Sequence, residues 1–161
     1  MRQAGRGDPS LLIRPIRPED APAYERFIGA IAAEDLRLRF ERGAPAKDLA
    51  RYTRIDAERE TAFVAVAPDA PHEILGEVRI FPFPDGATAE FAILVRSDAQ
   101  RRGIGRALLG KAIDYCRSRG AAALIGQMHP ENEAMIGLAL AAGMAVEHTP
   151  GASIAVAHLN L

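Results

Sequence analysis

The sequence has no tryptophan, a single cysteine and no long hydrophobic run. Cys116 cannot form an internal disulfide, and one cysteine with four scattered histidines gives no zinc-ligand spacing. No segment approaches the ~18 consecutive apolar residues of a membrane span, and the N-terminus lacks the apolar stretch of a signal peptide. We therefore expect a cytoplasmic protein with no metal site and no membrane partner.

The sequence also lacks an excess of charge of either sign. Its 20 basic and 21 acidic side chains leave a formal net charge of −1, and only 6% of its residues are aromatic. Such a chain has no overall positive field for a polyanion and few rings that could stack on bases. The composition argues against nucleic acid as the main partner.

What is present is typical of one soluble domain. The chain has 161 residues, of which 48% are apolar and 25% are charged, close to the averages for globular proteins. A domain of this size buries roughly 68–70% of the surface of its unfolded chain, which is enough for a core without metals or disulfides. We expect residues 1–8 to form a disordered tail and residues 9–161 to form a single domain.

The first half of the chain predicts strands that follow one another directly after an initial helical region. A strand at 11–16 precedes a helix that begins at Asp20, as its N-cap, and runs to about residue 33. Shorter helical segments are expected near 35–40 and 47–55. Apolar runs separated by turn residues then predict three strands in an antiparallel meander, at 61–66, 74–81 and 87–95.

The second half alternates helices with strands. Helices are expected at 105–119 and 132–142, with Gly120 and Gly143 just past their ends, and strands at 122–127, near 145 and at 154–159. Antiparallel strands followed by a strand-helix-strand unit predict an α/β (α+β) domain with a mixed sheet and helices on both faces.

Residues 95–106 join a predicted strand directly to an amphipathic helix, and this position suits a phosphate-binding loop. Gly103 and Gly105 let the backbone approach a ligand closely, and the free N–H groups and dipole of the helix start attract a pyrophosphate. The alternative is a plain strand-to-helix turn in which the glycines only relieve crowding. The pattern matches neither a Walker loop nor a dinucleotide fingerprint. Three arginines add positive charge here: Arg101, Arg102 and Arg106.

The segment from Gln100 to Gly105 resembles the Gln/Arg-x-x-Gly-x-Gly/Ala signature of the GNAT acetyltransferases. The resemblance covers nearly the whole chain, from residues 13–20 to Asn132 and Gly143, which match the last motif of the family. It implies a mixed, mostly antiparallel sheet of about six to seven strands flanked by about four helices, and acetyl-CoA as co-substrate. The cofactor-binding residues that it implies are Ile93, Leu94, Val95, Gln100, Arg101, Arg102, Gly103, Ile104, Gly105, Arg106 and Asn132.

Within this family, residues 34–40, 52–56 and 59–65 look like the acetyltransferase domain of bacterial Pat-type protein-lysine acetyltransferases. The resemblance implies an enzyme that moves an acetyl group from acetyl-CoA to the amine of a protein lysine. Two alternatives stay open: a small-molecule amine as acceptor, or a non-catalytic module that senses acyl-CoA. Strands near the C-terminus of such folds often pair between subunits, so a homodimer is compatible with the sequence.

Acetyl transfer to an amine requires a base, because a lysine amine with a pKa near 10.4 is mostly protonated at pH 7. Removing that proton costs on the order of 4–5 kcal/mol. Glu90, five residues before Val95, matches the Ala-Glu-Phe-Ala pattern that holds the catalytic carboxylate in Pat-like enzymes. We predict Glu90 as the general base. The alternative reading puts it on the solvent face of its strand, and Glu77 is the second candidate base.

The remaining candidates have smaller predicted roles. A backbone N–H near Leu94 would stabilise the developing oxyanion. Many GNAT enzymes carry a tyrosine seven residues after Asn132 that protonates the leaving thiolate, but this chain has Ala139 there. The thiolate would therefore leave unaided or through water. We predict structural roles for Cys116, on the apolar face of its helix, and for His129. Besides its implied contact with the cofactor, Asn132 is expected to cap the helix that starts there.

Overall fold

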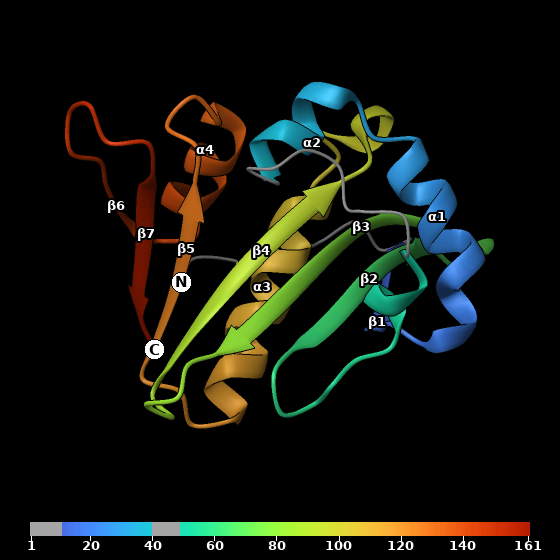
Figure 1. Ribbon diagram of the computed structural model, residues 1–161, viewed down its shortest axis with the longest axis horizontal. Helices are drawn as coiled ribbons and strands as arrows, with labels where there is room; N and C mark the ends of the chain where they lie inside the picture. Colours follow the sequence, from blue (N-terminus) through green and yellow to red (C-terminus); the bar gives the residue numbers. More distant parts are fainter. Residues whose placement is uncertain (1–10, 40–48) are drawn as a thin grey trace, which may run out of the picture.

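The computed structural model of the protein describes residues 11–39 and 49–161. These residues form one seven-stranded sheet in the order β1-β2-β3-β4-β5-β7-β6, in which only β4 and β5 pair in parallel (Figure 1). The strands are β1 (Leu12–Pro15), β2 (Thr61–Ala67), β3 (Ala70–Pro82), β4 (Thr88–Val95), β5 (Ala123–Met128), β6 (Ala145–Glu147) and β7 (Ala155–Asn160).

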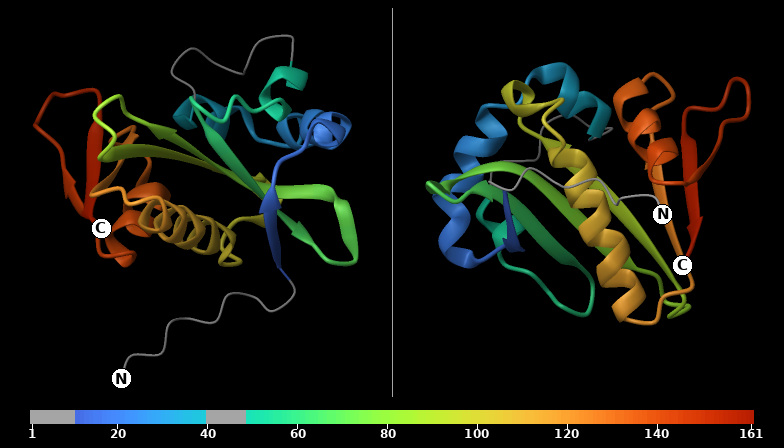
Figure 2. Two further views of the ribbon diagram at one scale, coloured as in Figure 1. Left: turned by 90° about the horizontal axis from the view of Figure 1, so that it is seen from below. Right: turned by 180° about the vertical axis from the view of Figure 1, so that it is seen from behind.

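Helices cover both faces of this sheet. On one side lie α1 (Ala21–Gly29), α2 (Ala33–Arg39) and the 3₁₀ turn η2 (Leu49–Thr53); on the other lie α3 (Ile104–Ser118) and α4 (Glu133–Ala141) (Figure 2). Two more 3₁₀ turns, η1 (Pro18–Asp20) and η3 (Ser97–Ala99), precede α1 and the loop that leads to α3. The described fold matches the predicted mixed, mostly antiparallel sheet with four α-helices.

Alternation along β3 divides the core into two layers. Val78 and Ile80 join the cluster beneath α3 and α4, whereas Glu77 and Arg79 point to the side of α1 and η2. Gly76 allows α3 to pack closely, because a Cβ at this position would lie 2.9 Å from Cδ1 of Leu108. The predicted apolar face of α3 is buried as expected, with Cys116 2% exposed within it.

Most predicted elements are confirmed with shifts of one or two residues at their ends, but β3 begins at Ala70, four residues before its predicted start. The meander of β2, β3 and β4 is present, and Gly120 and Gly143 follow α3 and α4 with φ of 78° and 85°, the left-handed conformation that ends helices. The first helix was predicted too long, since α1 ends at Gly29 and α2 begins separately at Ala33. Predictions for residues 1–8, 40 and 47–48 lie outside the described residues.

The predicted role of Asp20 as an N-cap is wrong. Asp20 occupies the N-cap position of α1, but its side chain makes no capping hydrogen bond. Both of its oxygens instead accept hydrogen bonds from Arg14 of β1, at 2.7 and 2.8 Å, and Oδ2 also accepts one from the Arg17 N–H. The guanidinium offers a charge-assisted bidentate partner, which is stronger than a neutral backbone N–H.

Candidate active site

A cavity of about 1020 Å³ opens where β4 and β5 separate. The two strands pair from Thr88 with Ala123 to Phe91 with Gly126, and no described strand pairs with this edge of β4 from Ala92 to Val95. The Phe91 ring lies over Gly126, where a Cβ would come within 2.5 Å of the ring. Backbone N–H and C=O groups of β4 therefore face the cavity and are available to an extended ligand.

The predicted phosphate loop forms one end of this cavity. Gly103 precedes α3 with φ of 82°, and Arg101 also has a positive φ, 64°, which is uncommon for a residue other than glycine. Arg102 is exposed and does not line the cavity, in contrast to its predicted neighbours. The predicted binding residues that do line it are Ile93, Leu94, Val95, Gln100, Arg101, Gly103, Ile104, Gly105, Arg106 and Asn132.

Glu90 lines the same cavity as this loop and is half-buried. Burial raises the pKa of its carboxyl, because the charged form is harder to keep in a poorly solvated site, and the positive charge of Arg39 on α2 partly opposes this increase. The carboxyl therefore borders a protein cavity and does not stand on an open solvent face. Its position suits a group that accepts a proton from a bound amine.

Glu77, the second candidate base, is 2% exposed and does not line this cavity. It forms an ion pair with Arg79, whose guanidinium also donates to the Tyr52 carbonyl and pairs with Glu60 at 3.3 Å. Burial and the neighbouring carboxylate of Glu77 raise the pKa of Tyr24, which packs against this group. These buried charges join β3 to α1 and η2. The surroundings of Glu77 therefore suit a role in holding the fold together and not the role of a base in the cavity.

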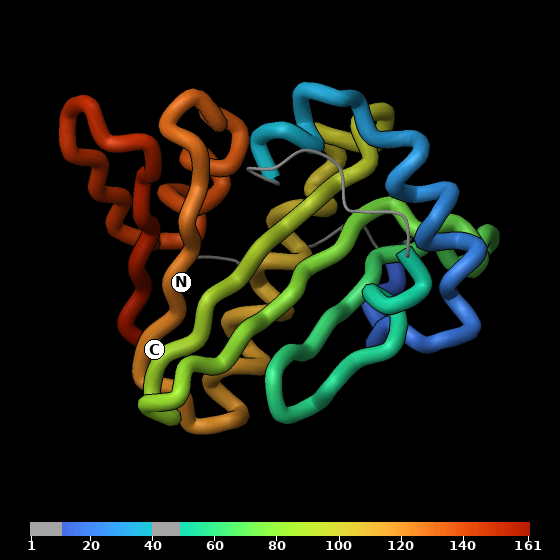
Figure 3. Tube along the Cα trace, in the orientation of Figure 1, coloured from blue at the N-terminus to red at the C-terminus, as the bar shows by residue number. Residues whose placement is uncertain are grey.

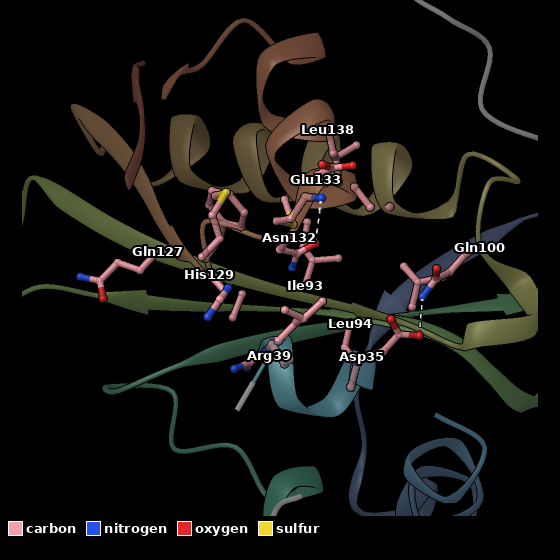
Figure 4. Close-up of a pocket in the computed structure, with 18 of the residues that line it drawn as sticks. Asp35, Arg39, Ile93, Leu94, Gln100, Gln127, His129, Asn132, Glu133 and Leu138 are labelled. Atoms are coloured by element: carbon pink, nitrogen blue, oxygen red, sulfur yellow. Dashed lines mark hydrogen bonds between the residues drawn. The ribbon is translucent and has the colours of Figure 1, made fainter. Parts of the chain in front are cut away.

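Several cavity residues were not predicted from the sequence. In Figure 4, Asp35 and Arg39 of α2 lie on one side of β4, and Glu133 and Leu138 of α4 lie on the other. No local pattern marks these positions, because α2 reaches the site only through contacts between distant parts of the chain. The additional lining residues are Asp35, Arg37, Leu38, Arg39, Phe91, Ala92, Ala99, Gln127, Met128, His129, Glu133, Ala134, Met135, Leu138, Ser153 and Ile154.

His129 and α4 bring further polar groups to the rim. Nδ1 of His129 accepts a hydrogen bond from the Glu131 N–H at 3.1 Å, so a neutral ring carries its proton on Nε2. Asn132 caps α4 as predicted, since its Oδ1 accepts from the Met135 N–H at 3.1 Å. Ala139 is fully buried in the core and supplies no proton donor to the cavity.

Two absences hold for the described part of the chain. It contains no group of three or more His, Cys, Asp or Glu side chains placed to hold a metal ion. Within residues 11–39 and 49–161, no helix is long and apolar enough to cross a membrane.

Comparisons with known proteins agree on one family. Residues 28–144 match the model of the acetyltransferase (GNAT) family. A curated acetyltransferase of Pseudomonas aeruginosa is 29% identical over 153 residues, which cover 92% of this chain and 82% of that protein. The GNAT domain of PAT from S. lividans is 26% identical, with a TM-score of 0.81 over 92% of this chain and 89% of that one. A Salmonella typhimurium protein solved with its cofactor acetyl-CoA shares the fold at 20% identity, with a TM-score of 0.69 over 94% of each chain.

Proposed function

Since this chain belongs to the acetyltransferase (GNAT) family and is an acyltransferase that uses acetyl-CoA, we propose that its acceptor is the side-chain amine of a protein lysine. The likeness to the GNAT domain of S. lividans PAT, taken with the resemblance of residues 34–40, 52–56 and 59–65 to Pat-type protein-lysine acetyltransferases, supports this acceptor class. We further propose that the enzyme works in the cytoplasm, where its single buried thiol, Cys116, agrees with a reducing environment.

The observation that supports acetyl transfer to an amine is that one cavity joins a candidate phosphate-binding loop, an open strand edge and a carboxylate. The loop around Gly103 leads into α3, whose N-terminal N–H groups and dipole favour the pyrophosphate of acetyl-CoA. The edge of β4 from Ala92 to Val95, with which no described strand pairs, suits the amide groups of the pantetheine arm. Glu90 then lies in the same cavity, where the thioester end would be reached.

In the proposed reaction, Glu90 takes a proton from the acceptor ammonium, directly or through one water molecule. The neutral nitrogen attacks the thioester carbonyl and the new C–N bond forms. As the C–S bond breaks and the CoA thiolate leaves, the nitrogen loses its second proton through water to that thiolate. A backbone N–H near Leu94 stabilises the charge that develops on the carbonyl oxygen. A positioned general base contributes about 10²–10⁴-fold to such a rate. Transfer is direct, because the Cys116 thiol is buried in the core and does not line the cavity.

The thiolate needs no side-chain acid. Ala139 occupies the position of the family's tyrosine and is fully buried. A thiol with a pKa of about 8–9 is a good leaving group, and water can protonate it afterwards. We therefore propose that the rate of this enzyme depends on the base and on alignment more than on a proton donor.

Calorimetric titration with acetyl-CoA, followed by rate measurements on lysine-containing peptides, tests the proposal. Glu90→Gln should bind acetyl-CoA as the parent does but acetylate peptides about 10²–10³-fold more slowly at pH 7. Glu147→Gln is the matched control, because Glu147 is exposed on β6 and does not line the cavity. Turnover by Glu90→Gln close to that of the parent would contradict the role of Glu90 as general base. Binding without transfer to any peptide or small amine would favour a sensing module, and transfer to small amines alone would exclude the lysine acceptor.

A further inference from the structure

A hydrogen-bonded cluster joins α2 to the loop that precedes α3. The Ser97 hydroxyl accepts from the Ala32 N–H at 2.8 Å and donates to Oδ2 of Asp35 at 2.6 Å. The same Asp35 oxygen accepts from Nε2 of Gln100 at 3.0 Å, as the dashed line in Figure 4 shows. One carboxylate oxygen thus links α2 to both η3 and the first residue of the phosphate loop.

This cluster also defines where α2 starts. The Ala32 N–H precedes the first turn of α2, where backbone donors have no partner within the helix, and the Ser97 hydroxyl satisfies it from another part of the chain. The sequence offers α2 no capping side chain at this point, since Ala32 precedes the helix and Ala33 is its first residue. The placement of α2 therefore depends on η3.

The other end of α2 belongs to the acceptor side of the cavity. Leu38 and Arg39 line the cavity together with Glu90, one helical turn beyond Asp35. Arg37 pairs at 3.4 Å with Glu131 in the connection from β5 to α4, which runs beside α2 in Figure 3. A seven-residue helix thus extends from the phosphate loop to the surroundings of the proposed base.

We propose that Asp35 is a positioning residue that couples occupation of the phosphate loop to the placement of α2 at the acceptor side. The inference rests on the proposed function, since it assigns the loop to the pyrophosphate of acetyl-CoA. A bound pyrophosphate restrains the loop at Gln100, the restrained Gln100 amide and Ser97 hydroxyl hold the Asp35 carboxylate, and α2 is held with it. Acetyl-CoA then organises the acceptor side before the amine arrives.

The coupling between the phosphate loop and α2 should be measurable as a change in the binding of the acceptor. Hydrogen bonds to a charged group are worth a factor of about ten or more in an equilibrium constant, so losing the Asp35 links should remove about a tenfold effect. The affinity for coenzyme A itself should change by less than about threefold, because Asp35 is not among the groups proposed to contact it. The acceptor KM at saturating acetyl-CoA should rise by about tenfold.

Hydrogen-deuterium exchange of the α2 amides, measured with and without coenzyme A, tests the coupling without an acceptor. In the parent, coenzyme A should slow exchange across residues 33–39 by about tenfold or more. In Asp35→Ala the slowing should persist at the start of α3 but fall below about twofold in α2. Ser97→Ala should behave in the same way and serves if Asp35→Ala fails to fold. Asp35→Asn keeps an accepting oxygen and should restore most of the coupling.

Asp98→Asn is the matched control, since Asp98 is an exposed carboxylate of η3 that pairs with Arg96 and not with α2. It should retain the parent's protection of α2. Equal protection of α2 in the parent, Asp35→Ala and Ser97→Ala would overturn the inference, as would the absence of protection in a parent that binds coenzyme A. A parent that does not bind coenzyme A at all would overturn the proposed function and the coupling with it.

Discussion

Replacing Gly126 with alanine should disturb the packing of the cleft without changing any polar group proposed to bind or react. Gly126 forms the last pair of the β4–β5 ladder, opposite Phe91, and the Phe91 ring covers it. An added Cβ would lie 2.5 Å from one ring carbon and 2.6 Å from another. Ordinary carbon–carbon contacts need about 3.5–4.0 Å, so the ring or the strand has to move by about 1 Å.

The cost follows from the rigidity of the core around this ring. Phe91 is 3% exposed and belongs to the cluster beneath α3, so it has little room to turn away. Overpacking of this kind costs about 1–3 kcal/mol. For a chain of this size, that loss lowers the midpoint of thermal unfolding by about 2–12 °C. The displaced ring also borders the cavity, so affinity for acetyl-CoA should fall several-fold.

Thermal unfolding by calorimetry and titration with acetyl-CoA measure both effects. Gly110→Ala is the control: a Cβ there would meet nothing within 4 Å, and alanine in the middle of α3 should stabilise the protein by about 0.5–1 kcal/mol. Phe91→Leu combined with Gly126→Ala should recover part of the lost stability. A Gly126→Ala protein that melts at or above the parent temperature and binds acetyl-CoA equally well would refute the reasoning.

Three further changes test other parts of the structure. Arg39→Gln removes a positive charge that lowers the pKa of Glu90, so the acid limb of the pH profile of kcat should move to higher pH; an unmoved limb would contradict this. Burial raises the pKa of Cys116 to about 11, and its reaction with a thiol reagent at pH 8 should be about a hundredfold slower in the folded than in the unfolded protein. Burial alone would raise the pKa of Asp20, but the hydrogen bonds and charge of Arg14 outweigh burial and lower this pKa. The ion pair therefore stabilises the folded protein above pH ~4, and this stabilisation is lost as the pH falls through the lowered pKa. Asp20→Asn should therefore lose about 1–3 kcal/mol of stability at neutral pH, with a difference from the parent that shrinks below about pH 4 in urea titrations.

Features with local sequence signals could be predicted. The turn into α3 at the end of the cavity could be placed, because glycines, arginines and the start of an amphipathic helix occur together between residues 95 and 106; its role as a phosphate loop stays a prediction. The caps by Asn132, Gly120 and Gly143 were predicted for the same reason, since each depends on neighbouring backbone. The mixed sheet could be predicted because the first half of the chain has consecutive strands, whereas the second half alternates strands with helices.

Features that depend on distant contacts could not be predicted. Nothing near Asp20 indicates that Arg14 takes its carboxylate away from the helix start. The contribution of α2 to the cavity depends on Asp35 meeting Ser97, 62 positions later in the chain. The last strand, β7, lies between β5 and β6, an order that no local pattern specifies.

The open edge of β4 also has a consequence for the lifetime of the protein. A ligand that completes the ladder from Ala92 to Val95 acts as a missing piece of the sheet and binds only the folded chain. Such a ligand stabilises the fold by mass action, by about 2.7 kcal/mol at a concentration one hundred times its Kd. Under the proposal that the pantetheine arm of acetyl-CoA lies along this edge, a shortage of acetyl-CoA would increase the unfolded fraction that proteases remove. The abundance of this enzyme would thereby follow the acetyl-CoA supply without any dedicated sensor.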